Sequence, residues 1–267
     1  TVTLGAGTQL YSGFSMDNSK VNSSANVVMN LNGGGDYYQV ARPTDSGALT
    51  ESFSFANTNL NLTNNSRLVP YGVLNLGDNA VLNLANGSGV DIASGASLLT
   101  AGSSRITGEG DISLSGAGSS ITMNGDGSGF EGSTVVSGGS LVVDGSLGGT
   151  SWQYIDGSLI QVSHQLTVNS GGTLSGGGSI GGDVHVTAGT VAVDLNKTLT
   201  LGAASTFSLN GGTLSFGVGA NNSSGKIVSL NTTTAPTFAG SNTLNLSTWI
   251  PGTYTVLQAG TAMAAGA

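Results

Sequence analysis

Residues 166–216 read LTVNSGGTLSGGGSIGGDVHVTAGTVAVDLNKTLTLGAASTFSLNGGTLSF. Apolar-x-apolar pairs recur here every seven or eight residues, separated by Gly, Ser, Thr, Asn and Asp. The pairs are Leu166/Val168, Val184/Val186, Val191/Val193, Leu199/Leu201, Phe207/Leu209 and Leu214/Phe216, with single apolar anchors at Leu174 and Ile180. Because successive side chains of a strand point to opposite faces, each pair predicts one short strand with two inward side chains. Strands this short must be buried against the next layer, so the pattern predicts a stack of coils.

Three such strands make one coil. Val184 and Phe207 are three steps apart, and the earlier anchors Leu74, Leu82 and Val90 follow one another at steps of eight. Coils of about 17 to 24 residues over residues 60–250 predict an all-β fold, a right-handed parallel β-helix with three faces. The side chains expected inside are Leu174, Ile180, Val184, Val186, Val191, Val193, Leu199, Leu201, Phe207 and Leu209.

Composition agrees with this fold and excludes several functions. The chain has 45 Gly, which are expected at coil corners where left-handed backbone is needed. Apolar residues at strand spacing argue against a disordered chain. Six basic and 14 acidic residues give a net charge of −8 without any Lys/Arg cluster, which argues against a nucleic-acid partner. The absence of Cys excludes disulfides and thiolate metal sites.

One motif resembles a known family. The string GGTLSGGGSIGGDV at residues 171–184 is similar to the passenger-associated strand repeat of Gram-negative autotransporters, and it is echoed at residues 138–141 and 211–214. Residues 252–260, GTYTVLQAG, resemble a strand found toward the C-terminal part of such passengers. The resemblance covers residues 133–260. The sequence departs from the family pattern at Thr187–Val193, where the family usually has Pro-Gly after the aliphatic strand.

The resemblance implies a passenger exported by type V secretion to the bacterial cell surface or beyond, with a C-terminal outer-membrane β-barrel that is missing from this sequence. Such a passenger is expected to be an adhesin without enzymatic activity, metal or cofactor. Its expected partners are a host surface, extracellular matrix, a glycan, or itself on a neighbouring cell in aggregation or biofilm formation. The chain begins at Thr1 without Met, so we expect a segment of a longer precursor. We treat residues 1–267 as one β-helix segment, with 1–59 less regular and 133–260 the strand-repeat region.

The alternative is a β-helix enzyme acting on a polysaccharide. A lyase needs carboxylates to hold calcium and a cation near the abstracted proton. Arg105 is the candidate cation, and one coil could bring Asp91 or Asp126 beside it; a solvated surface ion pair is the simpler interpretation. Ser128, in GDGSG, is the nearest approach to a serine-protease nucleophile loop, and a corner turn is the simpler explanation for it.

The histidines and the aromatic residues are ambiguous. His164 and His185 are close to one coil apart in the sequence, so their rings could stack on one face, but a metal site needs a third ligand. Alternation with Val184 and Val186 predicts that His185 points outward. Trp152, Tyr154 and Trp249 could bind sugars if exposed, or could pack in the core or cap it.

The less regular N-terminal segment has weak periodicity and carries the only candidate ligand-binding residues. These are Asp36, Tyr37, Tyr38 and Arg42, within DYYQVARPTD. The segment is expected either to project as a loop or small hairpin, where recognition residues tend to lie, or to form a longer coil corner.

Overall fold

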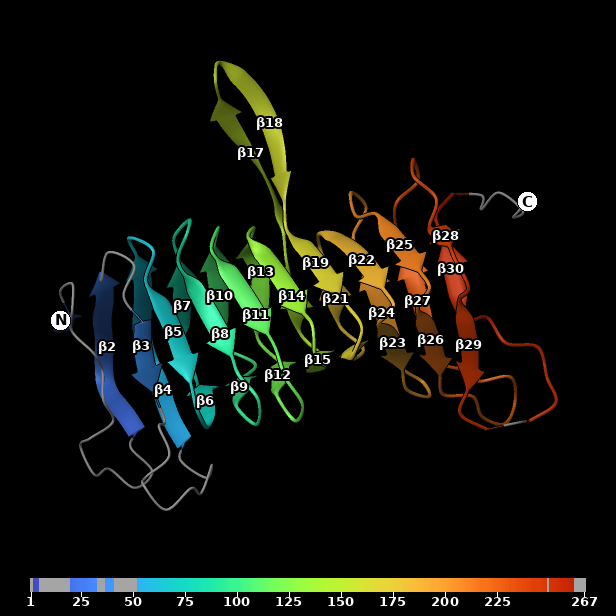
Figure 1. Ribbon diagram of the computed structural model, residues 1–267, viewed down its shortest axis with the longest axis horizontal. Helices are drawn as coiled ribbons and strands as arrows, with labels where there is room; N and C mark the ends of the chain where they lie inside the picture. Colours follow the sequence, from blue (N-terminus) through green and yellow to red (C-terminus); the bar gives the residue numbers. More distant parts are fainter. Residues whose placement is uncertain (1, 5–19, 33–36, 41–51, 249, 262–267) are drawn as a thin grey trace.

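The computed structural model describes residues 2–4, 20–32, 37–40, 52–248 and 250–261, and these residues are all-β with no helix. Nearly every strand pairs in parallel with the strand one coil away, and the coils stack along one axis (Figure 1). The described residues therefore contain no helix that could cross a membrane. The predicted parallel β-helix is confirmed.

Each coil contributes one strand to each of three faces. Face 1 consists of β3 (Tyr37–Val40), β5 (Arg67–Pro70), β8 (Gly89–Ile92), β11 (Asp111–Leu114), β14 (Ser133–Val136), β19 (Gln165–Val168), β22 (Asp183–Thr187), β25 (Phe207–Asn210) and β28 (Thr237–Ala239). Face 2 consists of β6 (Val73–Leu76), β9 (Ser97–Thr100), β12 (Ser120–Met123), β15 (Gly139–Val143), β20 (Gly172–Ser175), β23 (Thr190–Val193), β26 (Thr213–Phe216) and β29 (Thr243–Leu246). Face 3 consists of β7 (Val81–Leu84), β10 (Arg105–Gly108), β13 (Asp126–Phe130), β16 (Ser146–Leu147), β21 (Ser179–Ile180), β24 (Thr198–Leu201), β27 (Lys226–Ser229) and β30 (Leu257–Ala259).

The described N-terminal strands continue this stack. Strand β2 (Lys20–Asn32) pairs in parallel with β1 (Val2–Leu4) and with β4 (Ser52–Thr63). Strand β4 pairs with β6 near its start and with β7 near its end, so it runs through faces 2 and 3. Strand β3 pairs in parallel with β5, so Tyr37–Val40 is part of a coil and not a projecting hairpin.

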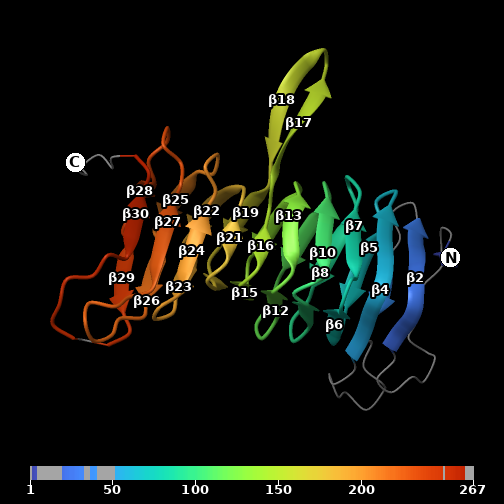
Figure 2. The same ribbon diagram turned by 180° about the vertical axis from the view of Figure 1, so that it is seen from behind.

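The winding is right-handed, as predicted. In Figure 1 the face 1 strands in front run downward while the face 3 strands behind them run upward, as the chain advances from left to right. Figure 2 shows the same sense from behind, with the face 3 strands running upward in front. This is the handedness that parallel strand crossovers prefer.

Coil length is regular in the first half and varies in the second. Leu68, Val90, Ile112 and Thr134 are successive ladder partners at an even sequence spacing. The coil from Thr134 to Leu166 is much longer, and the next one, from Leu166 to Val184, is shorter than the regular coils. The coil from Leu209 to Phe238 is long again. Both long coils exceed the predicted range, which is therefore wrong for them.

The first long coil contains a separate antiparallel hairpin, β17 (Thr150–Ile155) with β18 (Ser158–Ser163). The hairpin accounts for the extra length, because the chain leaves the stack before β17 and returns to it directly after β18.

The interior is built from the inward residues of all three faces. All ten predicted core residues are buried, with at most 3 % of their surface exposed. They line a continuous apolar column with Leu, Ile, Val, Phe and Met from every coil between β5 and β27.

Several corners close with four-residue turns whose last residue is small. The backbone N–H of Ala80, Ser88, Ala96 and Ser104 each donates to the carbonyl oxygen three residues earlier, at distances of 2.9 to 3.2 Å. These four side chains are buried and each directly precedes a strand. The Ser104 hydroxyl also donates to the Ala101 carbonyl at 2.8 Å. At these four corners the turn and its small buried residue lie directly before the next strand.

A single inward charge should collapse this stack. We expect Val191→Asp to lower the free energy of unfolding by at least about 3 kcal/mol, because the carboxylate would enter a dry column without a partner. Its neighbour Ala192 points outward from the same strand, so Ala192→Asp should change stability by less than about 1 kcal/mol. Urea unfolding followed by circular dichroism measures both variants. Equal losses would contradict the assignment of inner and outer faces.

Candidate functional site

Of the four predicted ligand residues near the N-terminus, the structure describes Tyr37 and Tyr38. Asp36 and Arg42 lie outside the described residues, as does Trp249. Tyr37 and Tyr38 lie in β3, whose backbone path is described. Their role in binding stays a prediction.

Arg105 meets one of its two predicted partners. Its Nε lies 3.6 Å from Asp126 Oδ2, and both side chains are about half exposed. The placement of Asp91 beside Arg105 is wrong, because these two residues are less than one coil apart in the sequence and Asp91 lies on face 1. The exposed pair of Arg105 and Asp126 has the geometry of a surface ion pair, which contributes little to stability.

Asp91 is instead held on face 1 by Arg67. Arg67 Nε donates to Asp91 Oδ2 at 2.9 Å, and its terminal nitrogen bonds the other carboxylate oxygen. The guanidinium lies over Gly89, where an added Cβ would clash with an Arg67 nitrogen. Burial raises the pKa of Asp91, but hydrogen bonds from Arg67 and Ser113 outweigh it and leave that pKa below its usual value. Arg67 is therefore engaged in binding a carboxylate of its own chain.

Ser128 lies within strand β13, where the register with β10 shifts between Asp126 and Gly129, so the expected corner turn is wrong. Its hydroxyl donates to Asp126 Oδ1 at 2.6 Å, and its backbone N–H donates to the same oxygen at 2.9 Å. These two bonds hold the pKa of Asp126 below its usual value. Neither histidine is positioned beside Ser128: His164 Nε2 is 3.0 Å from Thr134 Oγ1, and His185 Nδ1 is 2.8 Å from Ser208 Oγ.

The two histidines do not stack. Thr167 is the ladder partner of His185, so the residue level with His185 on the neighbouring coil is not His164. The expected spacing fails because the coil between them is shorter than the histidine separation. His185 points outward between two buried valines, as predicted. Within the described part of the chain, no three His, Cys, Asp or Glu side chains gather closely enough to hold a metal ion.

His164 is buried at the neck of the hairpin. Its ring packs 5.4 Å from the Phe130 ring, and an added Cβ at Gly148 would clash with its Nδ1. Burial lowers the pKa of His164 to about 4, although the charge of Asp183 opposes this shift. Its position is structural, at the point where the chain re-enters the coil.

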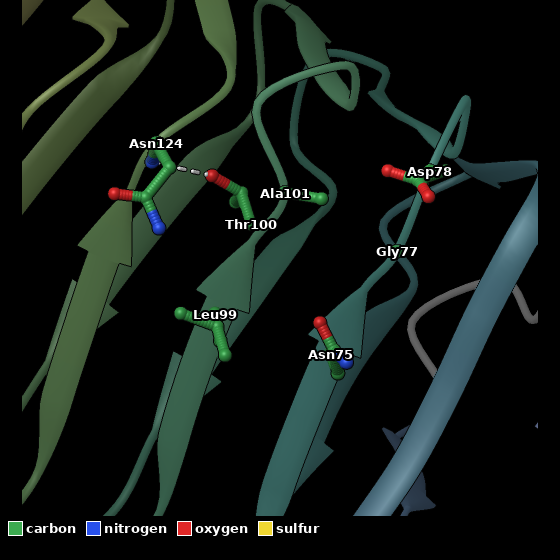
Figure 3. A pocket seen from close by; sticks show the side chains of 7 residues that line it. All are labelled: Asn75, Gly77, Asp78, Leu99, Thr100, Ala101 and Asn124. Atoms are coloured by element: carbon green, nitrogen blue, oxygen red, sulfur yellow. Dashed lines mark hydrogen bonds between the residues drawn. The ribbon is translucent and has the colours of Figure 1, made fainter.

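A shallow hollow lies on face 2 and the corner beside it. Asn75, Leu99 and Asn124 line it, with Gly77, Asp78, Thr100 and Ala101, and its volume is about 340 Å³ (Figure 3). Figure 3 shows Asn75 and Leu99 standing outward from neighbouring strands. The Thr100 hydroxyl oxygen accepts hydrogen bonds from the backbone N–H groups of Asn124 and Gly125, at 2.9 and 3.0 Å. This hollow is a dip in a flat surface and not an enclosed site.

Face 2 has a distinctive chemical surface. None of its strands from β6 to β29 contains a charged residue. One outward row along it is made only of hydroxyl side chains, each the ladder partner of the next: Ser97, Ser120, Ser140, Thr173, Thr190, Thr213 and Thr243. Faces 1 and 3 do carry charges, among them Asp111 and Arg105. The row begins at β9, because β6 has Val73 at this position, and its sequence signal is the Ser or Thr directly before an aliphatic residue in each later face 2 strand.

The hairpin β17–β18 is the feature that sequence reasoning missed. It leaves the coil at Gly149 and returns at His164, and it projects from the side of the stack in both views (Figures 1 and 2). Asp156 and Gly157 form its two-residue turn, with φ of 49° and 80°, which is typical of a type I′ hairpin. The sequence signal that could have predicted this hairpin is the Asp-Gly pair between two runs in which polar and apolar residues alternate.

Aromatic and aliphatic side chains are exposed on this hairpin. Trp152, Tyr154 and Leu159 share one of its faces and are 64 %, 77 % and 61 % exposed. On the other face, Gln153 Nε2 donates to Glu109 Oε1 at 2.6 Å, and Ser151 Oγ donates to Glu131 Oε2 at 2.6 Å. These bonds fix the hairpin to the corners of the preceding coils and leave the aromatic face uncovered.

His164 predicts a pH-dependent stability. Its pKa is lower in the folded chain than the ordinary value of 6.5, so the unfolded chain takes up a proton first and stability falls as pH drops from about 6.5 toward 4. Between pH 7 and pH 5 we expect a loss of about 2 kcal/mol. Asp91, Asp126 and Asp144 have lowered pKa values and stay ionised in this window. In His164→Gln the loss should be at least halved, measured by urea unfolding at both pH values; equal slopes would refute the assignment.

Comparison of the chain with known protein families, with curated proteins and with solved structures finds no match. The resemblance to autotransporter passengers therefore stays a prediction, and the function is argued from the surfaces described above.

Proposed function

We propose that this chain is a rigid, non-enzymatic passenger segment of an adhesin, exposed on or secreted from the surface of a Gram-negative bacterium. It would bind a host surface, extracellular matrix or glycan, or another copy of itself, through the extended surface of face 2. The observation that carries this proposal is the hydroxyl row on a face whose strands lack charge. The resemblance of residues 171–184 to passenger strand repeats supports the location.

A face of this kind suits adhesion by many weak contacts. Neighbouring strands of a sheet lie about 4.8 Å apart, so the hydroxyl groups form a regular, rigid row. Each hydrogen bond from such a row contributes only about 1 kcal/mol net, because it replaces a bond to water. Several engaged together become strong, since each bond formed raises the effective concentration for the next.

The lack of charge on face 2 also has a physical role. The chain carries a net charge of −8, and bacterial and host surfaces are commonly anionic. A neutral face can approach such a surface, or a second copy, with less repulsion than faces 1 and 3, which carry carboxylates such as Asp111 and Asp126.

The test compares matched triple variants. Thr173, Thr190 and Thr213 changed together to Lys should reduce attachment of displayed protein to cells or matrix at least tenfold, because long charged side chains interrupt three successive rungs. Val135, Gln165 and Thr167 on face 1, changed to Lys, add the same charge and should keep attachment within about twofold. Single alanine variants along the row should each reduce it only slightly.

The enzyme alternative has its own prediction. Arg105→Ala and Ser128→Ala should leave attachment unchanged, because both side chains bond to Asp126 of their own chain, on face 3 and not on the hydroxyl row of face 2. Attachment is measured by cell aggregation and by binding to coated surfaces, alongside an absorbance assay for unsaturated uronate products. If either single change abolishes function while the face 2 triple variant stays active, the adhesin proposal fails and a polysaccharide-acting enzyme is favoured.

A further inference from the structure

We infer that the hairpin β17–β18 is a homophilic arm: two copies of the chain associate by antiparallel pairing of their β17 strands into one four-stranded sheet. This inference goes beyond the proposed function, because it depends on the hairpin and not on face 2. The partner it names is a second copy of this chain.

The outer edge of β17 is unprotected. Proteins usually shield a free strand edge with charged side chains, Pro or a bulge. The sequence of β17, TSWQYI, includes no charged residue and no Pro, and its register with β18 runs without a bulge from Thr150 to Ile155. A two-stranded hairpin by itself is only marginally stable in water, so a further strand on this edge would stabilise it.

The pairing pattern decides which residues face a partner. In a hairpin with a two-residue turn, the pair flanking the turn exchanges both backbone hydrogen bonds, and alternate pairs after it do not. Ile155 and Ser158 flank the turn, so the backbone groups of Tyr154, Trp152 and Thr150 point away from β18. These three positions are symmetric about Trp152. An antiparallel copy therefore places Trp152 opposite its own counterpart and Tyr154 opposite Thr150 of the second copy.

Side-chain chemistry favours the β17 edge over the β18 edge. Residues directly opposite in an antiparallel pair lie on the same face of the sheet. The β17 pairing gathers Trp152 and Tyr154 of both copies, four rings that are exposed in the single chain. The equivalent β18 pairing would centre on Gln161, which is polar.

The direction of the hairpin favours a second copy as the partner. It projects away from the stack (Figures 1 and 2), so antiparallel pairing leaves the two bodies at opposite ends of the new sheet. Each chain carries a net charge of −8, and this separation keeps the two bodies apart. An interface limited to two hairpins is small, so the contact is weak in solution and is strengthened by multivalency on a surface. Salt should strengthen it by screening the repulsion between bodies.

The main experiment is sedimentation equilibrium of the full chain over a concentration series up to the millimolar range, at about 50 and about 300 mM NaCl, which differ clearly in screening length. The weight-average mass should rise toward that of a dimer, more at the higher salt. Deleting residues 150–163 should leave a monomer at every concentration.

This deletion variant should fold. It shortens the coil from Thr134 to Leu166 to the length of the next coil, which runs from Leu166 to Val184. The new chain ends are already adjacent, because the His164 N–H donates to the Gly149 carbonyl at 3.0 Å.

Two proline variants form the matched pair. Tyr154→Pro removes an N–H from the outer edge of β17, whereas Leu159→Pro removes one from the outer edge of β18; each also removes one exposed apolar side chain. Only Tyr154→Pro should abolish dimerisation. Circular dichroism confirms that both variants keep the β-helix.

A crosslink tests the register directly. The chain has no Cys, so Trp152→Cys introduces one thiol, and opposed residues of a hydrogen-bonded pair lie about 5.5 Å apart between Cα atoms, within disulfide reach. Mild oxidation should give a covalent dimer several-fold faster for Trp152→Cys than for Gln161→Cys, which is equally on the hairpin but not at the expected contact.

The inference is overturned by a monomer at all concentrations, by a dimer that survives deletion of 150–163, or by equal behaviour of the two proline variants. A hairpin that binds a glycan or another protein while the chain stays monomeric also overturns it. Failure of the proposed function is separate: the face 2 triple lysine variant would then keep its attachment, whatever the hairpin variants do.

Discussion

The corner turn determines the rest of this structure. At several corners the backbone N–H of a small buried residue, such as Ser104, donates to the carbonyl three residues earlier. A larger side chain there would push the next strand out of line with the one below it. Because strand pairing has a period of two, a shift of one residue would turn every inner Leu or Val outward. The corners therefore maintain the apolar column, and the column in turn leaves the outward residues free to vary.

That freedom explains how the three faces come to differ. The inner residues of all faces are similar aliphatic side chains, whereas the outer rows are acidic and basic on face 1 and uncharged on the strands of face 2. Arg67 illustrates how outer rows interact between coils: its guanidinium reaches past Gly89 to carboxylates of the next two coils, Asp91 and Asp111. The contacts of an outward residue are thus made with residues one coil away, and not with its neighbours in the sequence.

This dependence also marks what the sequence could and could not predict. Alternation within a strand identified the buried residues, including Val184 and Phe207, because burial is decided locally by period two. Contacts between coils require the coil length, which is constant along face 1 as far as Thr134, rises in the coil that carries the hairpin and falls in the next one. The pairing of Arg105 with Asp126 could be predicted from the sequence, since it spans one coil of nearly regular length. The relative position of the two histidines could not be predicted in this way. The hairpin interrupts the period itself, so periodicity gave no sign of it, although the Asp156-Gly157 turn did. The hydroxyl row on face 2 became visible only when strands distant in the sequence were aligned.

The neck of the hairpin has a consequence for how this chain could change over time. Gly149 and His164 are joined by a backbone hydrogen bond, and the coil closes through that bond whatever lies between them. Closure of the coil therefore does not depend on the length of the inserted segment, although Gln153 and Ser151 of the present hairpin bond to Glu109 and Glu131 of the body. Gly148 and the buried His164 imidazole pack against each other at this corner, beside the apolar column. This position is therefore an insertion site. One inserted segment can replace another there without a change in the packing of the coils, provided that its two ends lie side by side.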